Sequence, residues 1–272
     1  MYIGRVIGTA SRVEGSPPRF LRLAGHPLRW DLLTELARSD RRVGELSALS
    51  GRRQSLVSYH LRQLRDGGLV SMRRSAADGR DTYYALDLAS CGELLSSAGT
   101  SLHPGLATTR RTRRPHQPGR EPTWVLFLCT GNSARSQIAE ALAEDLSEGA
   151  IRAFSAGSDP KPLHPNAVRV MRERGIDLAG RRPKHLSEFE DRRFDHVISL
   201  CDRVREVCPE APEWPELTHW SIPDPAGESG GDAETLPEFE RVASELHTRI
   251  GFLIEAIEQT ENQPGQEVTE HA

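Results

Sequence analysis

Cys129 begins a segment whose residue types suit the capture of a tetrahedral oxyanion by a reactive thiol. The segment reads Cys129, Thr130, Gly131, Asn132, Ser133, Ala134, Arg135 and Ser136, so five residues separate the cysteine from the arginine. A guanidinium offers a rigid fork of donors to two oxygens of one oxyanion. We expect Ser136 to donate a hydrogen bond to the sulfur, and Gly131 to permit a tight backbone turn.

The elements around this segment predict that it is an anion-binding loop. Residues 124–128 form a continuous apolar run, which is typical of a strand buried on both faces, and a helix is predicted around residues 135–147. A loop that enters a helix directs backbone amides and the positive end of the helix dipole at one point. This field favours the thiolate of Cys129 over its thiol. The alternative is a structural cysteine at the end of a strand.

Two further cysteines follow another predicted strand, at residues 196–200. Cys201 and Cys208 lie in the stretch SLCDRVREVCPE, with six residues between them. Cysteine Cα atoms must come within about 7 Å of each other to form a disulfide, and a helical or looped segment of this length can bring them together. The pair is therefore a candidate for thiol–disulfide exchange; the alternative is two unrelated core residues.

The loop, placed between a buried strand and a helix, resembles that of the low-molecular-weight protein tyrosine phosphatases and of the thioredoxin-coupled arsenate reductases related to them. The resemblance covers about residues 123–258. The cysteine pair is a feature of the reductases, and the phosphatases usually carry a cysteine where this chain has Ala134. The segment HWSIPDPAGES resembles the reductases' Asp-Pro-Ala segment, with Asp224 as the acid and Ala226 where phosphatases tend to have an aromatic residue.

The resemblance implies a mechanism that reduces arsenate to arsenite. Cys129 attacks arsenate that the loop and Arg135 hold, and Asp224 assists proton transfer. Cys201 then attacks Cys129, and Cys208 attacks Cys201. Thioredoxin or another thiol reductant restores the resulting disulfide.

The resemblance requires no metal or organic cofactor. Some relatives hold a potassium ion near the loop, for which Asn132 and Glu140 are the candidate ligands here. Two other functions stay open at this point: a phosphatase that acts on phosphotyrosine, and a module that only senses an oxyanion.

The first 90 residues follow a different pattern. Apolar residues form a helical stripe from residue 20 to 36, interrupted near residues 25–27; a short helix ends at Gly51, and a third helix covers residues 54–65. Residues 69–72 and 82–86 are predicted strands, with Asp78-Gly79-Arg80 at the tip of their hairpin. Two short helices followed by a hairpin indicate a winged helix-turn-helix.

The stretch SLVSYHLRQLRDGGLVSMRR…GRDTYYAL resembles the ArsR family of bacterial repressors, over about residues 19–90. The resemblance implies a homodimer, formed through the N-terminal domain, on palindromic double-stranded operator DNA. Arsenic-sensing members often carry a Cys-x-Cys pair on the helix before the recognition helix, and here that helix reads VGELSALSG. The predicted DNA contacts are Arg52, Arg53, Gln54, Ser55, Ser58, Tyr59, Arg62 and Arg80, and Arg73 and Arg74 of the hairpin are further candidates for phosphate contact. The alternative is a solvated basic face.

Charge and composition agree with a fusion of two modules. Residues 1–120 hold 20 arginines, no lysine and 10 acidic residues, whereas residues 121–272 hold 15 basic and 29 acidic ones. No apolar run approaches the roughly 20 residues of a membrane span, and the N-terminus lacks the apolar core of a secretory signal, so we expect a cytosolic protein.

We expect five segments and two fold types. The segments are a flexible N-terminal tail (1–18), a DNA-binding domain (19–99), a linker (100–122), a reductase- or phosphatase-like domain (123–259) and a disordered tail (260–272). The first domain is predicted to be a mostly helical α+β winged helix-turn-helix. The second is predicted to be an α/β domain with a four-stranded parallel sheet of the low-molecular-weight phosphatase type.

Overall fold

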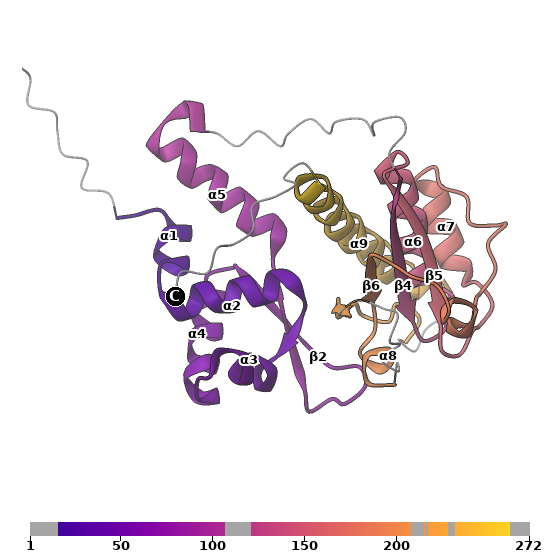
Figure 1. Ribbon diagram of the computed structural model, residues 1–272, viewed down its shortest axis with the longest axis horizontal. Coiled ribbons are helices and arrows are strands. Elements are labelled where there is room, and N and C mark those ends of the chain that lie inside the picture. Colours follow the sequence, from indigo (N-terminus) through magenta and orange to yellow (C-terminus); the bar gives the residue numbers. More distant parts are fainter. Residues whose placement is uncertain (1–15, 107–120, 208–214, 216, 228–231, 262–272) are drawn as a thin grey trace, which may run out of the picture.

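The computed structural model describes residues 16–106, 121–207, 215, 217–227 and 232–261, which form two domains side by side (Figure 1). We call residues 16–106 the N-terminal domain and residues 121–261 the C-terminal domain. In these parts of the chain, no helix is both long and apolar enough to cross a membrane. The predictions for residues 1–15, for most of the linker and for the end of the C-terminal tail lie outside the described residues.

The N-terminal domain is a set of helices followed by a three-stranded antiparallel sheet of order β1-β3-β2. Its elements are α1 (Arg19–Ala24), α2 (Pro27–Arg38), β1 (Arg41–Arg42), α3 (Val43–Ser50), α4 (Gln54–Asp66), β2 (Val70–Arg74), β3 (Thr82–Leu86), α5 (Leu88–Leu102) and the 3-10 helix η1 (Pro104–Leu106). The predicted interruption of the first helical stripe is confirmed, because Pro27 lacks an amide hydrogen and begins a new helix. Gly51, with φ of 62°, ends α3 as predicted.

Helix α5 was not predicted from the sequence. It begins at Asp87, whose side chain accepts from the amide of Ser90, and it continues through Leu102, three residues into the segment expected to be a linker. The stretch from Ser96 to Ser101 is made of Ser, Ala, Gly and Thr. These small residues weaken the helical signal, although apolar residues do recur at helical spacing, at Leu88, Cys91, Leu95, Ala98 and Leu102.

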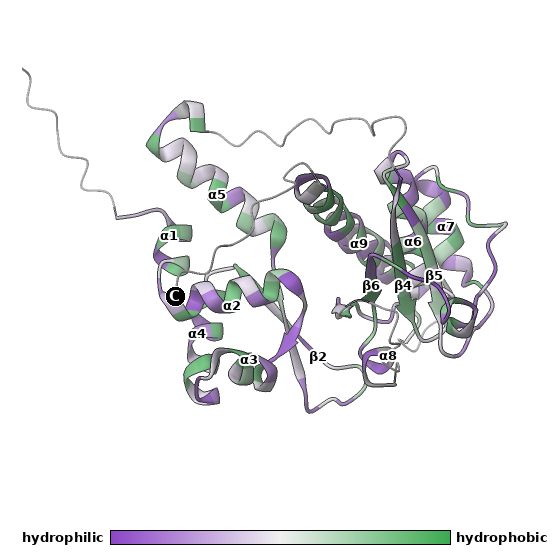
Figure 2. Ribbon diagram, viewed as in Figure 1, coloured by the Kyte–Doolittle hydropathy of each residue, from purple (hydrophilic) through white to green (hydrophobic). Residues whose placement is uncertain are grey.

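The C-terminal domain contains a parallel sheet of order β5-β4-β6-β7, which confirms the predicted four-stranded parallel sheet. Its elements are β4 (Thr123–Cys129), α6 (Arg135–Ser147), β5 (Ile151–Gly157), α7 (Pro165–Glu173), the 3-10 helix η2 (Leu186–Phe189), β6 (His196–Ser199), α8 (Asp202–Val207), β7 (Thr218–His219) and α9 (Asp232–Glu261). Strand β4 is hydrophobic along its length (Figure 2), and residues 125–128 are fully buried, as expected of a central strand. Pro237 lies inside helix α9, in its second turn.

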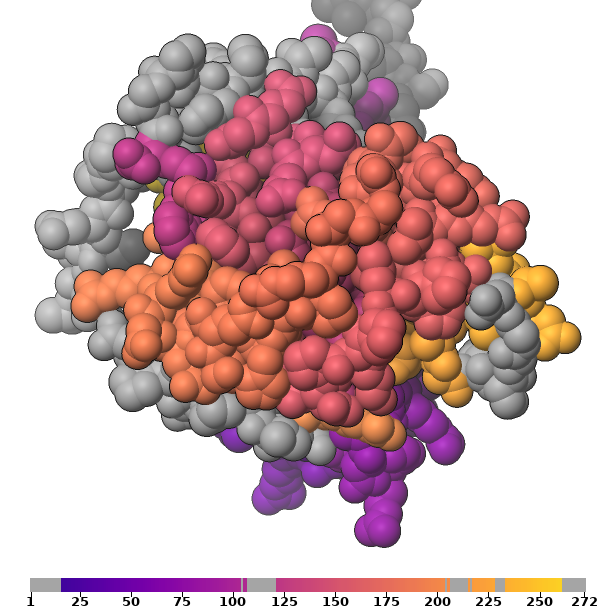
Figure 3. All heavy atoms as spheres, turned by 90° about the vertical axis from the view of Figure 1, so that its right-hand side faces the viewer, coloured from indigo at the N-terminus to yellow at the C-terminus, as the bar shows by residue number. Residues whose placement is uncertain are grey.

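The two domains meet at strand β7, an edge strand of the parallel sheet. The amide of Asp40 donates to the carbonyl of His219 at 2.8 Å, and the amide of His219 donates to the hydroxyl of Ser39 at 2.9 Å. The end of α2 therefore covers an edge that would otherwise expose backbone groups. Seen from the side of the C-terminal domain, the N-terminal domain protrudes below it (Figure 3).

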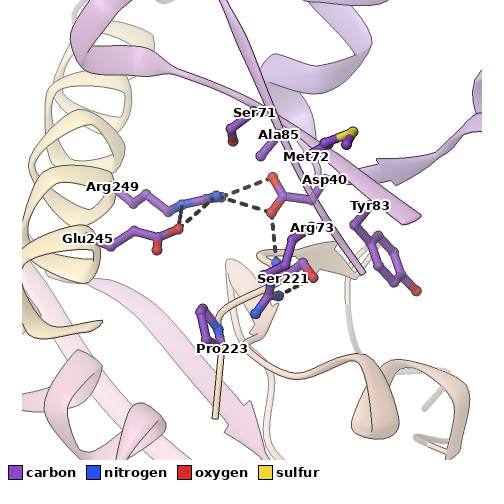
Figure 4. A pocket seen from close by; sticks show the side chains of 10 residues that line it. All are labelled: Asp40, Ser71, Met72, Arg73, Tyr83, Ala85, Ser221, Pro223, Glu245 and Arg249. Atoms are coloured by element: carbon purple, nitrogen blue, oxygen red, sulfur yellow. Dashed lines mark hydrogen bonds and ion pairs between the residues drawn. The ribbon is translucent and has the colours of Figure 1, made fainter. Parts of the chain in front are cut away.

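The Asp40 carboxylate is the charged centre of this contact (Figure 4). Arg249 of α9 donates to its two oxygens at 3.0 and 3.1 Å, and the amide of Ser221 donates at 2.7 Å. Both Asp40 and Arg249 are largely buried, at 2% and 12% side-chain exposure. Such a charge needs these partners, because a desolvated carboxylate without donors is strongly unfavourable.

We therefore expect Asp40→Ala to lower the free energy of unfolding by about 3 kcal/mol, since it leaves a buried guanidinium with one carboxylate fewer. Asp31→Ala, on the exposed side of α2, is the matched control and should change stability by less than about 0.5 kcal/mol. Urea denaturation of the full chain measures both. Equal midpoints for the two variants would show that Asp40 does not hold the domains together.

Candidate active site

The segment from Cys129 to Ser136 forms a loop between the end of β4 and the beginning of α6. Asn132 is its organising residue and is fully buried. Its amide nitrogen donates to the hydroxyls of Ser136 and Ser155, both at 2.8 Å. Its amide oxygen accepts from the side chain of Gln137 at 3.0 Å and from the backbone of Lys184 at 2.7 Å. The loop shape is thus fixed by one side chain at its centre.

The chain bends at Gly131 and at the residues around it. The left-handed backbone conformation falls on Asn132 instead, with φ of 43°. Asparagine tolerates this region better than most residues. The close approach that does require glycine is at Gly157, where an added Cβ would lie 2.5 Å from the carbonyl oxygen of Thr130. Gly157 could not be predicted from the sequence, since a glycine at the end of a strand is a common feature.

Cys129 lies at the bottom of the loop and is 2% exposed. Its sulfur is 2.9 Å from the hydroxyl oxygen of Ser136. That oxygen already accepts from the amide nitrogen of Asn132, so the hydroxyl hydrogen is available for the sulfur. Ser136 is thus placed to donate to the sulfur, in the way that the sequence led us to expect.

Arg135 joins the loop to the segment that contains Asp224. One nitrogen of the guanidinium donates to the carbonyl of Ile222 at 3.2 Å, and another lies 3.0 Å from the Asp224 carboxylate. Arg135 is buried, whereas about half of the Asp224 side chain is exposed. The donor fork that was expected to face an oxyanion is thus occupied by a carboxylate, and an incoming oxyanion competes with Asp224 for it.

Cys201 follows strand β6, which pairs with β4 so that Ser199 lies opposite Leu128. Parallel strands end at the same edge of a sheet, so Cys129 and Cys201 lie at one edge. The Cys201 sulfur is 3.3 Å from the hydroxyl of Thr130, the residue after Cys129, and Cys201 is 3% exposed. The structure therefore places a second thiol against the loop. Cys208, the third cysteine of the predicted relay, lies outside the described residues.

The remaining cysteine belongs to a different environment. Cys91 lies in the core of the N-terminal domain, where its thiol points toward the carbonyl of Leu69 at 3.8 Å. Burial raises the pKa of Cys91 to about 11, so it stays a protonated thiol near neutral pH.

Beside the loop, a polar cluster absent from the sequence analysis surrounds Asp202, the residue after Cys201. Its carboxylate is 1% exposed and accepts from the hydroxyl of Ser221 at 2.6 Å, from His219 at 3.1 Å and from the amide of Ala76 at 2.7 Å. Burial alone would raise the pKa of Asp202, but these donors hold it well below its usual range. A lone aspartate in the sequence carries no signal for such a cluster.

The proposed potassium ligands have other partners in the structure. The ammonium of Lys184 lies 2.9 and 3.1 Å from the two oxygens of Glu140, which also accepts from Ser155 and pairs with Arg181. The carboxylate is thus neutralised by side chains of this chain. A potassium ion here stays a prediction, and it would have to displace the Lys184 ammonium.

Most residues predicted to contact DNA are exposed along the beginning of α4 and at the tip of the hairpin. Exposed are Arg52, Arg53, Gln54, Ser55, Tyr59, Arg62 and Arg80, while Ser58 is half-buried. Arg74 is also exposed. Arg73 differs, since its guanidinium donates to the hydroxyl of Ser221 in the C-terminal domain instead of facing solvent.

Comparison with known proteins agrees with both halves of this description. Residues 124–263 match the family of low molecular weight phosphotyrosine protein phosphatases, and residues 26–72 match the arsR family of bacterial regulatory proteins. The chain belongs to the low molecular weight phosphotyrosine protein phosphatase family, with an arsR-type helix-turn-helix preceding the family domain.

Curated relatives are similar to the C-terminal domain. The arsenate reductase of Brevibacillus brevis is 39% identical over 126 residues, which is 46% of this chain and 90% of the relative. That of Bacillus subtilis is 36% identical over 126 residues, 46% of this chain and 91% of the relative.

Two solved structures are similar over the same region. One, described as an arsenate reductase in the phosphate binding state, is 34% identical, covers 50% of this chain and 98% of its own, and has a TM-score of 0.44. The YwlE arginine phosphatase from Geobacillus stearothermophilus is 29% identical. The match covers 53% of this chain and 100% of the phosphatase, with a TM-score of 0.43.

The Asp202 cluster predicts acid sensitivity. Burial lowers the pKa of His219 below its ordinary value of 6.5, so the folded chain binds this proton more weakly than the unfolded chain does. The contribution of neutral His219 to the free energy of unfolding is fully present above pH 6.5, and it decreases as the pH falls below this value. The corresponding loss for Asp202 begins only near pH 3.8, where the unfolded carboxyl titrates.

We expect His219→Gln to flatten the dependence of unfolding free energy on pH between 6.5 and 5. One proton contributes at most about 1.4 kcal/mol per pH unit. His247→Gln, on the exposed side of α9, should retain the wild-type slope. Urea denaturation at several pH values measures the slopes, and a wild-type slope in His219→Gln would exclude His219 as the source.

Proposed function

We propose that this chain is an arsenate reductase fused to a DNA-binding regulator, with residues 19–99 and 123–259 as the two functional units. The observation that carries the proposal is the position of Cys201, whose sulfur lies against Thr130 beside the loop cysteine. An oxyanion loop with one thiol suits either ester hydrolysis or reduction, but a second thiol that comes from a neighbouring strand end, and not from within the loop as in the phosphatases, favours thiol exchange. The curated relatives named arsenate reductases support this choice.

In the first step, the Cys129 thiolate attacks the arsenic of arsenate. A sulfur–arsenic bond forms, and one arsenic–oxygen bond breaks. Asp224 supplies the proton with which that oxygen leaves as water. The position of Asp224 supports this role, because its carboxylate lies 3.0 Å from the guanidinium that would hold the arsenate.

In the second step, the thiolate of Cys201 attacks the sulfur of Cys129. The sulfur–arsenic bond breaks, its electron pair stays on arsenic, and arsenite leaves. Arsenic gains two electrons, and the two sulfurs lose two as a disulfide forms. Cys208 then attacks Cys201 and releases Cys129 as a thiolate. Thioredoxin or another thiol reductant then reduces the Cys201–Cys208 disulfide by thiol–disulfide exchange.

The alternatives make different demands on the same site. A phosphatase needs Cys129, Arg135 and Asp224 but gains nothing from Cys201. A pure sensor needs the loop but not turnover. Comparing hydrolysis of p-nitrophenyl phosphate with thiol-coupled arsenate reduction separates all three, since the reductase assignment requires that arsenate turnover be the faster of the two.

The N-terminal domain is proposed to bind double-stranded operator DNA with α4, as a homodimer. The exposure of the first turns of α4 supports DNA contact, and exposed leucines at one end of the domain support an apolar dimer contact. These leucines are Leu95 and Leu102 of α5 and Leu106 of η1, which are 48%, 73% and 55% exposed.

Cysteine variants test the relay directly. We expect Cys129→Ser to abolish arsenate reduction, because it removes the attacking thiolate. Cys208→Ser should complete one turnover and then stop, with Cys129 and Cys201 joined. Rapid-quench measurement of arsenite and mass spectrometry of alkylated peptides follow both. Steady turnover at the wild-type rate in both Cys201→Ser and Cys208→Ser would overturn the relay.

A single arginine tests the DNA surface. Arg62→Ala should weaken binding to a random 30-base-pair duplex and reduce the slope of log affinity against log salt by about one, because one phosphate contact is lost. Arg38→Ala, an exposed arginine at the end of α2, is the matched control. Fluorescence anisotropy at several salt concentrations measures both slopes. If the two variants have the same slope, Arg62 does not face DNA.

A further inference from the structure

The hairpin of the N-terminal domain (residues 70–86, the wing) reaches into the C-terminal domain beside the relay thiol. The backbone amide of Ala76 donates to the Asp202 carboxylate at 2.7 Å. The guanidinium of Arg73 donates to the hydroxyl of Ser221 and lies 3.9 Å from Asp202. Figure 4 shows Arg73 and Ser221 next to each other at the contact between the domains.

The two residues that the wing contacts are covalently close to two groups of the proposed mechanism. Asp202 follows Cys201 directly, and Ser221 precedes Ile222, whose carbonyl accepts from Arg135. Asp202 and Ser221 are also bonded to each other at 2.6 Å. The wing therefore fixes the chain on both sides of the site, next to the relay thiol and next to the acid segment.

Charge and burial show why the wing contacts matter. Asp202 is an ionised carboxylate with 1% of its surface exposed, and a buried charge of this kind persists only where donors surround it. Of the four groups around it, His219 and Ser221 come from the C-terminal domain, and Arg73 and the Ala76 amide come from the wing. Without the wing, the segment that begins at Cys201 has to move until water reaches the carboxylate.

We propose that Arg73 and the Ala76 amide are positioning groups for the reductase, so that the DNA-binding domain completes the catalytic site of the other domain. They act through Asp202 on Cys201, and the wing itself holds no reacting atom. This inference rests on the proposed function, because the step it affects is the attack of Cys201 on Cys129. It also implies that the Arg73 guanidinium cannot bind a DNA phosphate while the wing is docked.

The test compares three full-length variants, Arg73→Ala, Arg73→Lys and Arg74→Ala. Arg74 is the neighbouring wing arginine and is exposed, so its variant removes the same charge without touching Asp202. The first readout is the rate at which iodoacetamide alkylates Cys201, followed by peptide mass spectrometry. The second is kcat and kcat/KM for thioredoxin-coupled arsenate reduction.

We expect Cys201 to be alkylated roughly 10- to 100-fold faster in Arg73→Ala than in Arg74→Ala, because the hydrogen bond to Ser221 and the ion pair with the buried Asp202 carboxylate no longer hold the segment. Its kcat should fall by about tenfold, and kcat/KM for arsenate should fall less, since Cys129 captures arsenate before Cys201 acts. Arg73→Lys should recover part of both effects, because an ammonium can still donate to Ser221.

Equal alkylation rates and equal kcat in Arg73→Ala and Arg74→Ala would overturn the proposal. If the wild-type chain reduces no arsenate, the proposed function fails, yet the alkylation rates still decide whether the wing positions Cys201. If thermal melting shows that Arg73→Ala is unfolded, Arg73→Lys against Arg74→Lys decides instead. Faster alkylation in the former supports the role, and equal rates exclude it.

Discussion

The arrangement of the two domains depends on the hydrogen bonds that the buried Asp202 carboxylate accepts. It is buried between the parallel sheet and the wing, and its donors come from both domains. Since an unpaired charge at such a depth is strongly unfavourable, satisfying it brings together α8, the segment after β7 and the wing. The position of the thiol that precedes it, Cys201, follows from this constraint.

A second buried polar residue, Asn132, fixes the shape of the loop within the C-terminal domain. It bonds four groups and holds the loop in the shape that places Cys129 against Ser136. The Asn132 and Asp202 clusters have different roles in the site. Under the proposed function, Asn132 shapes the loop that holds the oxyanion, and Asp202 fixes the position of the second thiol, Cys201. Fully satisfied polar groups of this kind allow one geometry, which a purely apolar core does not enforce.

The sequence predicted the parts of this site that depend on local pattern. The apolar run of β4, the spacing from Cys129 to Arg135 and the strand before Cys201 each reside in one short stretch. The parts that were missed link residues far apart in the chain, such as Asp40 with Arg249 and Asp202 with Ala76. Neither periodicity nor spacing reports a polar contact between distant segments. Helix α5 was missed for another reason, since the small polar residues of its second half weaken its apolar stripe.

The contact between the domains also bears on how a signal could pass between them. The helix before α4 has no cysteine, so under the proposed function the arsenic chemistry belongs to the C-terminal domain, and the contacts between the domains are its route to DNA. The basic charge of the first 120 residues and the acidic charge of the rest favour such contacts. Arg73 is the residue that connects the contact between the domains with DNA binding. Under the two proposals, its guanidinium serves either the buried carboxylate of Asp202 or a DNA phosphate, so docking on the C-terminal domain competes with DNA for the same side chain.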